Sequence, residues 1–198
     1  MEFGRKLYSL GEIYTILYKG IRSAPYMSKA KRKGEMNTEF IERIMLAVTE
    51  VNGCPMCSYA HTKMALEAGM SNEEIHNMLS GVVDDVPEEE LQAIMFAQHY
   101  ADSRGNPSKE SWDQVVESYG IVKAKGILGA IRAIMIGNAL GIPWGSFINR
   151  FKGKPDERSN LAYELGVIVI GSAMIPFAMV HALIASIIGV RRQNQYIA

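Results

Sequence analysis

The helical spacing of apolar residues after position 37 constrains the fold of this chain more than any other feature. Apolar side chains recur there every three or four residues, at Ile41, Ile44, Met45, Val48 and Val51. This is the period of one face of an α-helix. Asn37-Thr38 can cap such a helix, and Asn52-Gly53 is a dipeptide typical of chain reversal. The pattern therefore predicts an amphipathic helix that ends in a tight turn.

A second helix is predicted directly after this turn, and it carries both cysteines of the chain. The proline that follows Cys54 has the fixed φ suited to a first helical turn, so Cys54 is predicted to be the N-cap. Cys57 then lies one turn along the same face, and His61 lies four residues further on the same stripe. Gly69 is a natural residue to end this helix.

Two thiols and an imidazole on one ridge suit dithiol chemistry. The positive end of a helix dipole and a nearby imidazole either lower the pKa of a thiol or accept its proton. A second cysteine three residues away can resolve a sulfenic acid before it is oxidised further. In a reducing cytosol a lone cysteine pair is more often catalytic than structural.

Glu42 lies at the edge of the apolar stripe of the first helix. It precedes Asn52 by ten residues, about 15 Å, and His61 follows Gly53 by eight residues, about 12 Å. If the two helices fold back antiparallel, the carboxylate and the imidazole lie at similar distances from the turn that joins the helices. The sequence thus allows a relay in which Glu42 orients His61 and His61 receives the thiol proton.

The spacing of Glu42, Cys54-Pro-Met-Cys57 and His61 resembles the motif of the AhpD-like alkylhydroperoxidases within the carboxymuconolactone decarboxylase superfamily. The resemblance implies an all-α, oligomeric protein that reduces hydroperoxides or a peroxiredoxin-type partner through its cysteine pair, with no cofactor beyond the dithiol. It implies that Cys57 attacks, Cys54 resolves, His61 is the base and Glu42 accepts the proton behind it. Decarboxylase members lack the cysteine pair, so lactone decarboxylation is not expected.

Two details of the motif leave alternatives. Met56 stands where the best-known peroxidases of this family have a histidine, so one member of their proton relay is absent here. The sequence leaves open whether this change abolishes peroxidase activity or only slows it. Helix-terminus electrostatics alone favour Cys54 as the attacking thiol, whereas the family pattern and the imidazole four residues after Cys57 favour Cys57. We adopt Cys57 as the expectation.

The motif residues also allow roles other than peroxidase chemistry. A structural zinc site needs four ligands and no second ligand pair has the usual spacing, so no metal is expected. The thiols could be inert and buried. The alternative function is a non-enzymatic helical oligomer, with or without membrane attachment, that uses the pair as a redox-sensitive staple. The remaining histidines, His76, His99 and His181, are predicted to be structural.

The rest of the chain also predicts helices, and no segment shows the period-two alternation of a strand. We expect an N-terminal helix and basic linker over 1–36, an AhpD-like helical domain over 37–150 and an apolar helical extension over 151–198. Gly120 should end one helix, and small residues at Gly126 and Gly129 allow close helix contact, within the core or between subunits of a homo-oligomer.

Charge and apolarity bear on location and partners. The chain has 21 basic and 21 acidic residues, and the basic run 28–36 lacks aromatics, so it is predicted to be a solvated linker without nucleic-acid binding. The first twenty residues lack the apolar core of a secretory signal, which predicts a cytoplasmic protein.

The segment 165–190 is the exception, because its only ionisable residue is His181 and its length would allow it to cross a bilayer. Pro176 should divide it, so a buried helical hairpin or a subunit interface is preferred to a membrane anchor.

Overall fold

Every regular element between residues 6 and 188, the part of the chain that the computed structural model describes, is helical. The elements are α1 (Leu10–Arg32), α2 (Thr38–Asn52), α3 (Pro55–Ala68), α4 (Asn72–Leu79), α5 (Glu88–Asp102), α6 (Lys109–Phe151), α7 (Leu161–Gly166), the π-helical η1 (Val167–Gly171) and α8 (Ser172–Ile187). The predicted all-α fold with a C-terminal apolar helix is confirmed.

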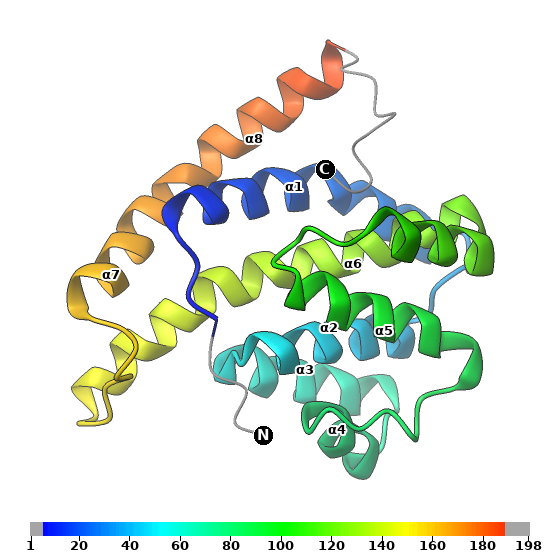
Figure 1. Cartoon of the computed structure of the whole chain (residues 1–198), viewed down its shortest axis with the longest axis horizontal. Coiled ribbons are helices and arrows are strands. Elements are labelled where there is room, and N and C mark those ends of the chain that lie inside the picture. Colours follow the sequence, from blue (N-terminus) through cyan, green and yellow to red (C-terminus); the bar gives the residue numbers. More distant parts are fainter. Residues whose placement is uncertain (1–5, 189–198) are drawn as a thin grey trace.

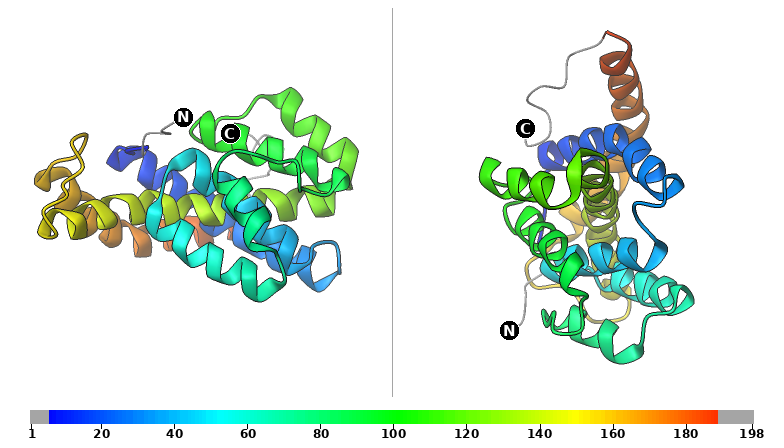
Figure 2. Two further views of the ribbon diagram at one scale, coloured as in Figure 1. Left: turned by 90° about the horizontal axis from the view of Figure 1, so that it is seen from below. Right: turned by 90° about the vertical axis from the view of Figure 1, so that its right-hand side faces the viewer.

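The two long helices α1 and α6 run side by side through the middle of the molecule (Figure 1). Helices α2 and α5 pack against α6, and the shorter α3 and α4 lie outside them. Helix α8 lies over α1, on the face opposite α3 and α4 (Figure 2). Because α6 contacts α1, α2, α3 and α5, it forms the centre of the core and also reaches the helix that carries the cysteines.

Glycines let α1 and α6 approach each other closely. A Cβ atom on Gly129 would lie 2.9 Å from the backbone nitrogen of Met27 and 2.9 Å from the carbonyl oxygen of Ser23. A Cβ atom on Gly126 would clash with Ala30. These two glycines of α6 therefore form a close contact with α1 within this chain. A side chain at either position would not fit.

Three helix boundaries test the sequence-based expectations. Gly120 has φ 68° and ψ 159° and interrupts α6, as predicted. Helix α1 continues through Pro25 to Arg32, so the prediction of a linker is wrong for the first half of 28–36. The prediction that Pro176 divides its segment is also wrong, because α8 continues through it. The π-helical turn η1 ends at Gly171, immediately before α8 begins at Ser172.

Two helical segments in the described part of the chain are long and apolar enough to cross a membrane. The first is α6, whose apolar stretch is 78% buried and forms the core. The second runs through Leu161–Ile187 and is only 22% buried, so it is not the buried core hairpin that the sequence suggested. Its apolarity is compatible with a soluble or a membrane-associated protein.

A buried ion-pair network fixes α2, α4 and α5 to one another. Arg43 of α2 donates from Nε to Glu74 Oε1 at 2.6 Å and from Nη1 to Glu90 Oε2 at 3.0 Å. All three residues are buried, and burial raises the pKa of the Glu90 carboxyl although Arg43 opposes that shift. The single guanidinium therefore bridges two largely buried carboxylates.

Glu50 of α2 is another buried carboxylate, and its Oε1 atom has no hydrogen-bond partner among the described residues. Burial raises the pKa of Glu50 above its usual 4.5. The folded state thus holds this proton to higher pH than the unfolded state, so the contribution of Glu50 to stability falls as pH rises from about 4.5 through the raised pKa.

We therefore expect Glu50→Gln to increase the free energy of unfolding by about 1 kcal/mol at pH 7 and by less at pH 4. Urea denaturation at both pH values measures this. The exposed Glu117→Gln is the control and should change stability by less than about 0.5 kcal/mol at either pH. A stabilisation of Glu50→Gln that is equal at pH 4 and pH 7 would show that the charge is not the cause.

Candidate redox site on α2 and α3

The turn between α2 and α3 is held by Asn52 and Gly53. Gly53 ends α2 with φ 65° and ψ 47°, the left-handed conformation that favours glycine. The fully buried Asn52 accepts a hydrogen bond from the Tyr8 hydroxyl at 2.7 Å, and its amide nitrogen donates to the Met135 sulfur at 3.2 Å. The chain reversal that the sequence predicted is therefore anchored to α6 and to the segment before α1.

Cys54 caps α3, as predicted. Its Sγ atom accepts a hydrogen bond from the backbone N–H of Cys57 at 3.3 Å, and Pro55 occupies the first helical position. Cys54 and Cys57 form a disulfide. Both cysteines are buried, Cys54 completely and Cys57 with 8% of its surface exposed.

Glu42 and His61 are in direct contact across the helix pair. The distance between Glu42 Oε2 and His61 Nδ1 is 2.7 Å, and the Glu42 side chain is only 2% exposed. An ionised carboxylate can only accept, so Nδ1 carries the hydrogen of this bond. In a neutral imidazole this leaves Nε2 free to accept a proton. An ionised Glu42 thus favours the His61 tautomer that carries its hydrogen on Nδ1.

The structure brings the four predicted site residues together in two pairs on neighbouring helices. Glu42 pairs with His61, and Cys54 pairs with Cys57, one turn before His61 on α3. Two histidines outside the motif are held by hydrogen bonds: His99 accepts one from the Ser108 N–H, and His181 Nδ1 bonds the Tyr14 hydroxyl. Within residues 6–188, no group of three or more His, Cys, Asp and Glu side chains could hold a metal ion.

Gly141 of α6 is a component of this site that sequence reasoning did not identify. A Cβ atom on Gly141 would lie 3.1 Å from both the Cys54 and the Cys57 sulfur atoms. The backbone of α6 therefore covers the disulfide at van der Waals distance. Its position 84 residues after Cys57 gives no local signal of this contact.

A small apolar pocket of about 260 Å³ lies beside Gly141. Met56 of α3, Leu140 and Trp144 of α6, and Ile168 of η1 contribute to its lining. Met56, at the position of the family histidine, thus extends an apolar surface next to the sulfurs. The π-helical turn η1 forms the far wall, and such turns are frequent at functional sites.

We expect Gly141→Ala to slow reduction of the disulfide by dithiothreitol by about tenfold, because a methyl group would press on both sulfurs. Gly137→Ala is the matched control. Gly137 lines the same pocket one turn earlier, and its added Cβ would make an ordinary 3.6 Å contact with Ile134. Thiol release followed by time measures both rates. Equal slowing of the two variants would exclude a specific role for Gly141.

Comparison with known proteins finds a family similarity over part of the chain. Residues 24–99 match the family model described as the carboxymuconolactone decarboxylase family. The matched segment begins within α1, ends within α5 and contains Glu42, both cysteines and His61. No curated protein and no solved structure gave a significant match. The segment 24–99, with the cysteine pair that it contains, is therefore similar to the carboxymuconolactone decarboxylase family, in agreement with its AhpD-like motif.

Proposed function

We propose that the protein is a thiol-dependent peroxidase that reduces organic hydroperoxides. The observation that carries the proposal is the part-buried Glu42–His61 hydrogen bond, one helical turn from a cysteine pair. A structural disulfide needs no oriented base, whereas a thiol nucleophile does.

The reaction proceeds in two steps from the reduced pair. The Cys57 thiolate, whose proton has passed to His61, attacks the terminal oxygen of the hydroperoxide. The O–O bond breaks and Cys57 becomes a sulfenic acid. The alkoxide takes the proton from His61 and leaves as an alcohol. Cys54 then attacks the Cys57 sulfur and water leaves as the disulfide forms. A dithiol donor or a peroxiredoxin-type partner protein restores both thiols.

The apolar pocket favours organic hydroperoxides over hydrogen peroxide. Its walls of Met56, Leu140, Trp144 and Ile168 are suited to an alkyl or aryl group rather than to water-like molecules. An apolar substituent held there places its peroxide next to the disulfide-forming sulfurs. We further propose that the protein acts in the cytoplasm as a homo-oligomer.

The proposal is tested by mixing the reduced protein with cumene hydroperoxide and dithiothreitol. We expect catalytic consumption, with one dithiol oxidised for each hydroperoxide reduced. The protein carrying both Cys54→Ser and Cys57→Ser is the control and should match the uncatalysed rate. If wild type also matches that rate while reduction of the pair changes its assembly state, the protein is a redox-sensitive oligomer and not a peroxidase.

Glu42→Gln is expected to lower the rate of hydroperoxide reduction at pH 7 about 100-fold. The amide can still accept a hydrogen bond from Nδ1, but it lacks the charge that stabilises a protonated His61. The loss should shrink at higher pH, where the thiol ionises without a base. Stopped-flow rates from pH 6 to pH 10 measure this, with the exposed Glu67→Gln as control. A loss that is independent of pH would assign Glu42 a structural role only.

A further inference from the structure

A second and larger cavity, of about 810 Å³, lies between α1, α6 and α8. Its volume falls within the range of roughly 300–1,000 Å³ that is usual for small-molecule sites. It shares no lining residue with the pocket beside the disulfide. The two cavities are therefore separate sites.

The charged residues that line this cavity are all cationic. Arg22, Lys29 and Arg32 lie on one stripe of α1, spaced seven and three residues apart, and Lys125 comes from α6. Within the described residues, no carboxylate lines the cavity or forms an ion pair with these three residues of α1. Lys29 and Arg32 belong to the basic run 28–36, which the sequence predicted to be a solvated linker. This run thus supplies two of the four cations that line the cavity.

The opposite wall of the cavity is apolar. Met179, Val180 and Leu183 of α8 line it, and each is more than half exposed. Ile121 of α6 and Ile21 of α1 continue this surface. Apolar side chains left exposed on one wall and cationic side chains on another make the cavity amphipathic.

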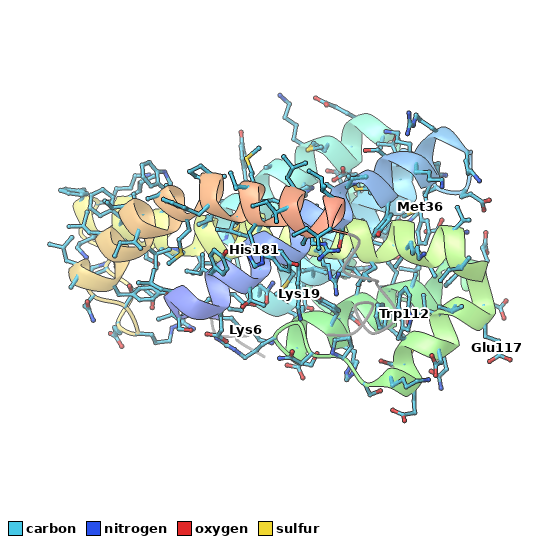
Figure 3. All side chains as sticks on the ribbon, turned by 90° about the horizontal axis from the view of Figure 1, so that it is seen from above. Lys6, Lys19, Met36, Trp112, Glu117 and His181 are labelled. Atoms are coloured by element: carbon cyan, nitrogen blue, oxygen red, sulfur yellow. A yellow bond between two sulfur atoms is a disulfide. The ribbon has the colours of Figure 1, made fainter. Side chains whose placement is uncertain are left out.

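Helix α8 contacts α1 beside the cavity. His181, labelled in Figure 3, stacks on the Tyr18 ring, with centroids 4.3 Å apart, and its Nδ1 lies 2.8 Å from the Tyr14 hydroxyl. Tyr18 in turn accepts a hydrogen bond from Arg22. Toward its C-terminal end, α8 rises away from α1 (Figure 1). The contact between His181 and Tyr18 thus lies next to one of the cations that line the cavity.

We propose that this cavity binds a single-chain amphiphile with an anionic head group, of the kind represented by a long-chain fatty-acid anion. The hydrocarbon chain covers the exposed apolar wall of α8, and the carboxylate is neutralised by the stripe of Arg22, Lys29 and Arg32. A free molecule fits better than a bilayer surface, because a flat surface cannot enter a space walled by three helices. The proposal does not depend on peroxidase activity.

The test titrates the full-length, oxidised protein with dodecanoate below its micelle concentration, against a bound fluorescent fatty-acid analogue. We expect the double variant Lys29→Gln, Arg32→Gln to bind dodecanoate about tenfold more weakly. The matched control is Lys31→Gln, Lys33→Gln, which removes the same charge from the same end of α1 outside the cavity and should change affinity less than twofold. Lengthening decanoate to dodecanoate should tighten binding about fourfold per methylene group.

Several outcomes would overturn the proposal. If the two double variants bound dodecanoate equally weakly, binding would reflect general charge attraction and not a site in the cavity. Equal affinity for dodecanol and dodecanoate would show that the cavity does not recognise an anionic head group. Binding to anionic phospholipid vesicles without binding of free dodecanoate would identify a membrane surface as the occupant. Self-association that dodecanoate does not alter would identify a second copy of the chain as the occupant.

Discussion

Reduced protein carrying Cys54→Ser is expected to consume one equivalent of cumene hydroperoxide and then stop, whereas Cys57→Ser protein should react at least about 10³-fold more slowly than wild type. The asymmetry follows from the structure: the Cys57 residue is 8% exposed and has His61 one turn away, while Cys54 is completely buried at the helix N-cap. Without Cys54 the sulfenic acid on Cys57 forms but cannot be resolved.

Single-turnover mixing followed by mass spectrometry separates these outcomes. The Cys54→Ser protein should gain one oxygen atom on Cys57, which a sulfenic-acid trap captures. Wild type should instead lose two thiols and gain no oxygen. The reverse pattern, with an oxidised Cys54 in the Cys57→Ser protein, would assign the attack to the N-cap cysteine, as helix-terminus electrostatics alone suggest.

The largest expected effect on stability comes from Arg43→Met. This substitution leaves Glu74 and Glu90 buried without their shared cation, and breaking a buried pair in this way costs about 3–5 kcal/mol. Methionine keeps much of the side-chain volume, so lost packing contributes little. Chemical denaturation of the oxidised protein measures the change in the free energy of unfolding.

Two companion variants identify the cause. Adding Glu74→Gln and Glu90→Gln to Arg43→Met should recover much of the lost stability, because no buried charge then remains. Lys63→Met removes an equal charge from an exposed pair with Glu67 and should cost less than about 0.5 kcal/mol. If Arg43→Met resembled Lys63→Met, the network would contribute nothing beyond a surface ion pair.

The helix pair that carries the site could be predicted from sequence because local rules determine it. The apolar period of α2, the Asn52-Gly53 turn and Cys54-Pro55 at the start of α3 each act within a few residues. The antiparallel return then places Glu42 opposite His61 by helix rise alone. The roles of these residues in catalysis stay predictions, as does the division of the chain into 1–36, 37–150 and 151–198.

The parts that could not be predicted depend on contacts between distant segments. Gly141 meets the two sulfurs only because α6 crosses α3, and the sequence around Gly141 resembles any helix with small residues. The role of Arg43 has no local signal, since its partners lie 31 and 47 residues away. The continuation of α8 through Pro176 has no local sequence signal either.

The most direct measurement of the central claim is the mapping of thiol reactivity in the reduced wild-type protein. With iodoacetamide at a tenth of the thiol concentration, peptide mapping should find the label mainly on Cys57, and Glu42→Gln should reduce this preference at pH 7 because it weakens His61 as a base. Label found mainly on Cys54, or a preference for Cys57 that Glu42→Gln leaves unchanged, would contradict the relay proposed for Glu42, His61 and Cys57.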